Sequence, residues 1–165
     1  MDDRFYTVRG YELQRYNKNI LTPALEDYLE MIYRNSLSEN YIRINILAQL
    51  LNVKDSSASK MVKKLGELGF VDYEKYGIIK LTKEGKELGK YLLRRHNIIE
   101  KFLSFIGCDK EALEEAELME HIITDNTVKN IEILYDFIRG NEDVMEKYIK
   151  FRNDTKDNNV KITKV

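Results

Sequence analysis

The sequence is poor in several residue types: its 165 residues include one cysteine, one proline and two histidines. The single cysteine, Cys108, cannot form an internal disulfide of the kind that stabilises secreted domains. No run of about 18 apolar residues occurs, so no segment is a candidate transmembrane helix. The first residues, MDDRFYTVRG, lack the apolar region of a secretory signal. These absences predict a soluble, cytoplasmic protein with no membrane partner.

Motifs that carry catalysis are also missing. The sequence contains no H-E-x-x-H helix, no glycine-rich phosphate loop, and no Ser/His/Asp or Cys/His set in a supporting context. Di-metal carboxylate enzymes built on helical bundles use Glu and His at i and i+3, whereas Glu117 and His121 are four residues apart. We therefore expect neither an enzyme nor a protein with a small-molecule substrate.

What the sequence does contain is an uneven distribution of charge. Its 43% hydrophobic and 33% charged residues are typical of a folded globular protein, and its net charge is −1. Residues 41–96 hold 12 Lys and Arg against 6 Asp and Glu, whereas residues 97–165 hold 10 against 15. A basic middle segment favours contact with an anionic partner, although lysines scattered over solvated helices would produce the same totals.

The basic segment follows the order of a winged helix-turn-helix. Thr22 and Pro23 suit the N-cap and the first position of a helix. Apolar spacing predicts two further helices, at about 44–51 and 55–68. The stretch FVDYEKYGIIKL then predicts two strands that fold back near 75–77. In this arrangement the second helix of the helix-turn-helix lies in the DNA major groove.

That second helix and the hairpin carry the residues expected to contact double-stranded DNA. Serines at the start of the helix can approach base edges, and lysines neutralise phosphate charge. Asp55, at the helix start, is discordant, because its carboxylate either caps the helix or faces phosphates. The expected DNA-binding residues are Arg43, Ser56, Ser57, Ser59, Lys60, Lys63 and Lys75.

Apolar periodicity also predicts the rest of the fold. Ile46 and Leu50 are expected to turn inward, and a long helix that starts after Thr82 is expected to bury Tyr91. Shorter helices follow at about 109–123, 126–139 and 142–152. The predicted fold class is mainly α (α+β), with a winged helix-turn-helix domain followed by an all-helical domain. The expected division is 1–20 for an N-terminal extension, 21–91 for the winged domain, 92–152 for the helical domain and 153–165 for a polar tail.

Acidic residues lie at helical neighbour spacing in two places. Glu117, Glu120 and His121 form a narrow polar stripe of about 100° between apolar flanks, so the stripe is expected to point into protein. Asp27 and Glu30 form an i, i+3 pair on the side of their helix opposite its apolar stripe. Buried carboxylates need a compensating cation, and either a metal ion or a Lys or Arg side chain would serve.

Several segments resemble the diphtheria-toxin-repressor family of metal-responsive regulators, and its manganese-sensing branch in particular. They are LTPALEDYLEMIY, SSASKMVKKL, YEKYGIIKLTKEGKELGK, LLRRHNIIEKFLSFIG and ELMEHIITDNT, in order from about Leu21 to about Phe137. The D-Y-L-E, R-R-H and E-x-x-E-H elements are specific in combination. The resemblance implies the metal ligands Asp27, Glu30, His96, Glu117, Glu120 and His121.

The resemblance also implies a metal and a function. Iron-sensing relatives place Met at the position of Asp27 and Cys at that of Glu117, and acids at both leave a thiol-free site that suits Mn²⁺. The manganese branch implies two Mn²⁺ ions per subunit, with Fe²⁺ as the alternative. It further implies a homodimeric repressor, dimerised through its helical domain, that binds palindromic operator DNA and controls metal-ion uptake genes. A winged-helix regulator that answers to a small organic ligand is the other alternative.

The sequence departs from the family pattern in a few places. No SH3-like third domain is expected, and residues 1–20 are an addition. Ile122 stands where relatives often have a second histidine. Asp55 replaces a proline or small residue, which leaves the details of base reading open. Cys108 matches no ligand position and is expected to pack against its neighbours.

Overall fold

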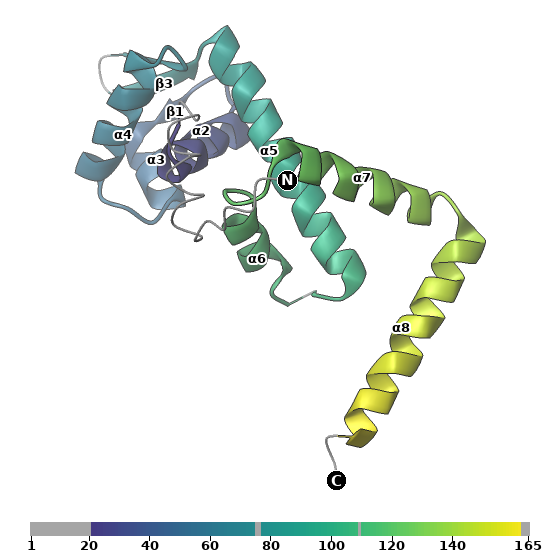
Figure 1. Ribbon diagram of the computed structural model, residues 1–165. Coiled ribbons are helices and arrows are strands. Elements are labelled where there is room, and N and C mark those ends of the chain that lie inside the picture. The colour runs from purple at the N-terminus through teal and green to yellow at the C-terminus, as the bar shows by residue number, and fades with distance from the viewer. Residues whose placement is uncertain (1–20, 75–76, 109, 163–165) are drawn as a thin grey trace, which may run out of the picture. The chain divides into compact units, whose positions relative to one another are not determined.

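The computed structural model describes residues 21–74, 77–108 and 110–162, with side chains described through residue 155. Two compact units divide between Arg94 and Arg95, inside the longest helix. Within the described residues, no helix has the length and apolar character needed to span a bilayer. The elements (Figure 1) are α2 (Pro23–Ser36), β1 (Ile42–Arg43), α3 (Ile44–Leu50), α4 (Asp55–Glu67), β2 (Val71–Tyr73), β3 (Ile78–Leu81), α5 (Lys83–Ile106), α6 (Ala112–Met119), α7 (Asp125–Arg139) and α8 (Glu142–Ile162).

Helix α2 begins where the sequence predicts. The Thr22 hydroxyl accepts a hydrogen bond from the Leu25 amide at 3.4 Å, and Pro23 occupies the first turn, where it leaves no intrahelical bond unmade. Leu25 and Leu29 are buried on the face that meets the core of the first unit. The predicted helix start and apolar stripe are therefore confirmed.

The helix-turn-helix is formed by α3 and α4. Asn52 has a positive φ of 51° in the turn between them, a conformation that Asn adopts more readily than most residues. The predicted burial of Ile46 and Leu50 is wrong, because they are 40% and 51% exposed. Helix α3 is only seven residues long, and Leu47 and Ala48 alone occupy its buried side.

A three-stranded antiparallel sheet completes the winged domain. Its strand order is β1-β3-β2, with Val71 paired to Leu81 and Ile42 paired to Ile79. The two predicted hairpin strands are thus present. Ile42 and Arg43, just before α3, form a third strand because they pair with β3. Lys75, at the expected tip of the wing, lies outside the described residues.

Helix α5 starts from a tightly packed junction. The Thr82 hydroxyl donates to the Gly69 carbonyl at 2.8 Å and accepts from the Gly85 amide at 3.0 Å, so the predicted helix start is confirmed. A Cβ at Gly85 would lie only 1.9 Å from the Phe70 carbonyl oxygen, so glycine is required there. Tyr91 is 37% exposed, and its predicted burial is wrong.

The second unit is helical throughout its described elements. Ile99 and Leu103 of α5 pack with Ala112, Ala116 and Val128 of the next two helices. Figure 1 shows α6, α7 and α8 following α5 along the chain, with no strand among the described residues after 94. The class predicted from the sequence, mainly α with a small sheet, is confirmed.

Two predicted helix ends in this unit are wrong. Helix α6 ends at Met119 rather than near 123, and Thr124, which is extended with φ −83° and ψ 157°, caps α7. Helix α8 continues to Ile162 rather than ending near 152. No glycine or proline occurs between 142 and 162 to stop it, and its Asn and Asp residues reduce helix propensity only slightly.

Candidate metal centre

The second unit contains a buried histidine–carboxylate pair. His96 lies on α5 and Glu120 directly follows α6, and the His96 Nδ1 is 3.0 Å from the Glu120 Oε2. The two side chains are 1% and 2% exposed. A buried carboxylate is costly unless a hydrogen bond or a cation compensates it. The imidazole supplies that compensation within the protein.

Three further titratable side chains surround this pair in the same unit. The Glu117 Oε1 lies 3.6 Å from the His96 Nδ1, and the Glu100 Oε2 lies 3.7 Å from the His96 Nε2. The His121 Nε2 is 3.7 Å from the Glu120 Oε1. Sequence reasoning did not include Glu100 among the ligands, although its i, i+4 spacing from His96 was a signal for it.

The stripe predicted to point inward is only partly buried. The Glu117 side chain is 52% exposed, whereas Glu120 is buried and His121 is intermediate. Although α6 ends at Met119, Glu120 keeps helical dihedrals of −61° and −25°, and its amide donates to the Ala116 carbonyl. Glu117 and Glu120 therefore remain one turn apart, with Glu120 on the inner side.

The chemistry of these donors fits a divalent metal ion. Within the second unit, two imidazoles and three carboxylates form four nitrogen–oxygen pairs at 3.0–3.7 Å, with Glu117 and Glu120 near the His96 Nδ1 and Glu100 near its Nε2. Ligands bound at roughly 2.0–2.2 Å to a shared ion lie about 3 Å apart, and the His96–Glu120 separation matches that spacing. Imidazole and carboxylate without thiolate suit Mn²⁺, Fe²⁺ and similar ions better than a soft metal.

The other two predicted ligands lie on α2 in the first unit. The Arg34 Nε donates to the Glu30 Oε1 at 2.8 Å, and its Nη2 contacts the same oxygen. Glu30 is 6% exposed, so this pair lies in a partly dehydrated environment. Asp27 is half-buried, and burial together with the Asp27 charge raises the pKa of Tyr28. The arginine that the sequence left open as an alternative to a metal is thus present at Glu30.

Comparison with known proteins assigns both units to domains of one protein family. Residues 20–79 match the family described as iron dependent repressor, N-terminal DNA binding domain. Residues 82–148 match its metal binding and dimerisation domain. The chain is also 39% identical, over 127 residues, to the HTH-type transcriptional regulator MntR of Lysinibacillus sphaericus, covering 76% of this chain and 91% of that relative. The chain belongs to the iron-dependent repressor family.

Solved structures agree with this assignment. The manganese regulator SloR aligns with a TM-score of 0.61 at 34% identity, over 71% of this chain and 55% of that one. A manganese-dependent transcriptional repressor in complex with manganese aligns with a TM-score of 0.59 at 30% identity, over 68% and 53%. The chain thus spans about half the length of these structures. The prediction of a metal-dependent transcriptional repressor, rather than a member of an enzyme family, is confirmed at the level of the family.

The DNA-binding domain of this repressor presents a basic helix to solvent. The predicted contacts Ser56, Ser57, Lys60 and Lys63 on α4 are exposed, whereas Ser59 is half-buried. Arg43, also exposed, is the N-cap residue of α3. The proposal that these residues contact DNA remains a prediction, and their exposure is what it requires.

The wing, whose strands β2 and β3 follow α4 in the sequence, carries an ion pair. The Lys80 Nζ on β3 lies 2.9 Å from the Glu74 Oε1. That hydrogen bond, with the charge of Glu74, raises the pKa of Lys80. Lys80 is therefore a cation at every pH at which a repressor works, but part of its charge is offset by Glu74.

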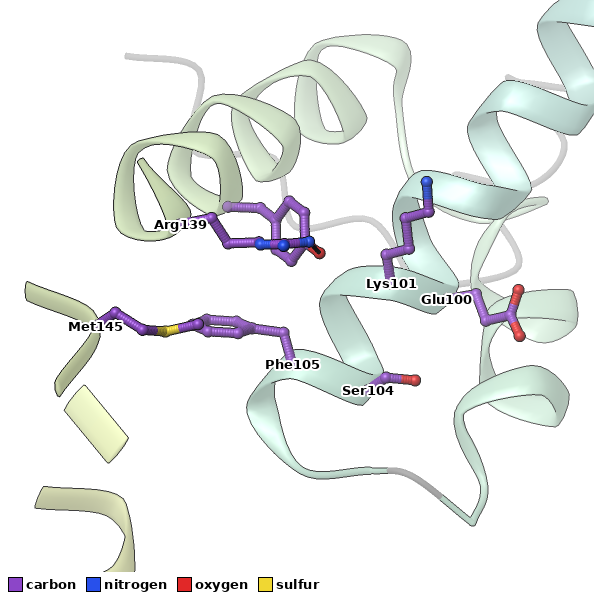
Figure 2. Close-up of a pocket in the computed structure, with 7 residues that line it drawn as sticks. Glu100, Lys101, Ser104, Phe105, Arg139 and Met145 are labelled. Carbon is purple, nitrogen blue, oxygen red and sulfur yellow. Dashed lines mark hydrogen bonds between the residues drawn. The ribbon is translucent and has the colours of Figure 1, made fainter. Parts of the chain in front are cut away.

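The metal-binding and dimerisation domain also contains a shallow cavity of about 450 Å³ between α5, α7 and α8. Figure 2 shows Phe105 and Met145 side by side at one end, with Lys101, Glu100 and Ser104 along the opposite side. Arg139, also on the lining, donates to the Tyr135 hydroxyl at 3.0 Å. Two cationic side chains against one carboxylate disfavour a metal ion, so this cavity is not a second candidate metal site.

Proposed function

We propose that this member of the iron-dependent repressor family is a Mn²⁺-responsive repressor that binds a palindromic operator as a homodimer. The observation that carries the proposal is the buried His96–Glu120 pair, surrounded by further nitrogen and oxygen donors and no thiol. Support for manganese comes from relatives whose names state manganese regulation. Fe²⁺ is the competing ion, because the same donors accept it.

The proposed ligands come from both units. His96, Glu117, Glu120 and His121 are supplied by the metal-binding domain, and Asp27 and Glu30 by α2 of the DNA-binding domain. Four carboxylates and two imidazoles offer about ten donor atoms, more than the roughly six that one octahedral ion takes, so these residues would hold two ions per subunit. When bound, the metal supplies positive charge that neutralises these carboxylates.

The carboxylates of the protein explain how the charge of a bound metal would regulate DNA binding. In the proposed centre, the carboxylates of Asp27, Glu30, Glu117 and Glu120 would repel one another without a cation, since Arg34 pairs only with Glu30. We expect this repulsion to leave the DNA-binding domain free to adopt positions that do not match an operator. An ion that binds the matching arrangement more tightly shifts the population toward it, and operator DNA must tighten metal binding by the same factor.

A homodimer needs a self-complementary apolar surface, and the second unit offers one. Ile133, Leu134 and Phe137 on α7 are 49–57% exposed and follow one face of the helix. Leu118 and Ile122, in and after α6, are exposed as well. Exposed apolar side chains that gather on one face of a soluble domain are typical of interaction sites. A two-fold dimer would place two α4 helices on half-sites related by the same symmetry, which is why the operator should be palindromic.

The decisive experiment is fluorescence anisotropy with a labelled palindromic operator and the full-length protein. Titrations with Mn²⁺, Fe²⁺, Co²⁺ and Zn²⁺, each against a chelator control, should show tight binding only with metal. Mn²⁺ should produce tight operator binding at concentrations that saturate the metal sites of the protein. Tight binding in chelator would refute metal gating. Operator binding that does not change with any metal but changes with a cell extract of small molecules would favour the organic-ligand alternative. Metal-ion uptake genes would then no longer be the expected targets.

A further inference from the structure

We propose that Asp55 reads a base in the operator, by accepting a hydrogen bond from the exocyclic amino group of a cytosine. This inference rests on the proposed DNA binding by α4. Asp55 is the first residue of that helix and is exposed to solvent. The first turn of a recognition helix is the part that contacts base edges in the major groove.

Asp55 is not occupied as a helix cap. The N-cap position of α4 belongs to Lys54, whose side chain makes no capping hydrogen bond, and the backbone carbonyl of Lys54 accepts from the Ser57 and Ala58 amides. The expectation that the Asp55 carboxylate caps the helix is therefore wrong for the N-cap itself.

The Asp55 carboxylate also has no cation within the first turn of its own helix. The residues at i+3 and i+4 are Ala58 and Ser59, so no lysine stands within one turn. The first lysine after it on the helix, Lys60 at i+5, is about 7.5 Å farther along the axis and about 140° around it, and Lys63 at i+8 is about 12 Å farther along. Among the described residues, no hydrogen bond or ion pair involves the Asp55 side chain. Its charge is left for an intermolecular partner or for solvent.

DNA offers a carboxylate very few partners. Phosphates present only acceptors and a negative charge, so an acid at this position weakens binding unless it finds a donor. In the major groove the donors are the amino groups of cytosine and adenine, and Asp is a recognised partner of the cytosine N4. Guanine and thymine present acceptors there. An acid in an otherwise basic surface therefore selects for cytosine by repulsion of the alternatives as well as by attraction.

The test is selection of binding sites from a random duplex pool by the full-length Mn²⁺-loaded protein, for wild type and for Asp55→Ala. We expect wild type to enrich a cytosine at one position in each half-site and Asp55→Ala to lose that preference while it keeps the others. In the selected operator, replacing this cytosine by a base without the 4-amino group should weaken wild-type binding roughly 5- to 100-fold. The same replacement should leave Asp55→Ala nearly unaffected.

Two further variants separate base reading from plain charge. Glu67→Gln removes an exposed acid from the last residue of the same helix, about 18 Å away, and should not change the preferred sequence. Asp55→Asn should move the preference from cytosine toward adenine, because an amide bonds both N6 and N7 of adenine.

The outcomes distinguish this inference from the function on which it rests. If wild type and Asp55→Ala select the same sequence, and the variant merely binds all duplexes more tightly, Asp55 acts only through its charge and the inference is overturned. A wild-type preference for adenine at the position that depends on Asp55 overturns the choice of cytosine. If wild type selects no sequence with Mn²⁺, the proposed operator recognition is wrong, and base reading by Asp55 is overturned as well.

Discussion

The His96 imidazole and the Glu120 carboxylate lie in hydrogen-bond contact, Nδ1 to Oε2 at 3.0 Å, although 24 residues separate them. Both are groups that bind divalent metals, and each presently satisfies the other. The contact compensates a buried acid by a hydrogen bond from within the protein. It also brings a nitrogen and an oxygen donor to one point inside the protein, where water competes little for a cation.

Replacing Glu120 by Gln should abolish metal-stimulated operator binding. The amide keeps the shape and can still hydrogen-bond His96, but it lacks the charge that attracts a divalent ion. We expect metal affinity, measured by calorimetry, to fall by more than tenfold, while the circular dichroism spectrum stays unchanged. Glu114→Gln, which removes an exposed acid from α6, the helix that ends just before Glu120, is the matched control and should behave as wild type. Full metal-stimulated binding by Glu120→Gln would contradict the ligand assignment.

Leu134→Asp should dissociate the dimer. Leu134 is 49% exposed on α7 beside Ile133 and Phe137, and a carboxylate placed in an apolar interface would be buried without a partner. Sedimentation equilibrium should show the dimer weakened at least about tenfold, with an unchanged monomer fold. Lys147→Asp, at a polar exposed site on α8, should leave the dimer intact. An undisturbed Leu134→Asp dimer would place the interface on another surface.

Gly85→Ala and Gly66→Ala should change stability in opposite directions. The new Cβ at residue 85 would lie 1.9 Å from a backbone carbonyl oxygen, and the backbone must shift to relieve it. We expect a loss of about 1–3 kcal/mol in the free energy of unfolding. At Gly66, inside α4, the nearest atom would be 3.5 Å away, so alanine should add about 0.4–1 kcal/mol. Urea unfolding measures both, and equal effects would refute the packing at α5.

Glu74→Gln should strengthen the electrostatic part of DNA binding. Wild-type Lys80 is held by Glu74, which raises its pKa. A raised pKa means that the pair stabilises the fold fully below the ordinary lysine value and loses its effect only as pH rises through the raised one. Between pH 6 and 8 neither protein should therefore change its stability through this pair. At pH 7 the variant frees the ammonium for a phosphate.

The measurement for this variant is the salt dependence of operator affinity. If Lys80 contacts a phosphate once Glu74 is neutral, the logarithm of the binding constant should fall more steeply with the logarithm of salt concentration, by about one unit of slope. An identical slope for the two proteins would mean that Lys80 stays away from the DNA backbone.

Local signals in the sequence determined where several helices begin and in which order the elements of the winged domain follow one another. Thr22 with Pro23, and Thr82 before α5, mark helix starts, because a cap acts on amides only two or three residues away. The order of helix, turn, helix and hairpin follows from apolar spacing and turn residues. The candidate metal ligands came from short motifs and from their resemblance to a family, and their joint coordination of a metal remains a proposal.

Tertiary structure decided what depends on distant partners. Burial separates Glu120, 2% exposed, from Glu117, 52% exposed, although both belong to one stripe and both carboxylates approach the His96 Nδ1. Ile42 and its neighbour became a strand because β3 was available to pair with them. Exposure of Ile46 and Leu50 could not be read from apolar spacing, since periodicity identifies a face but not whether another element covers it. Such contacts form only when the chain closes long loops, and no single segment carries the information that specifies them.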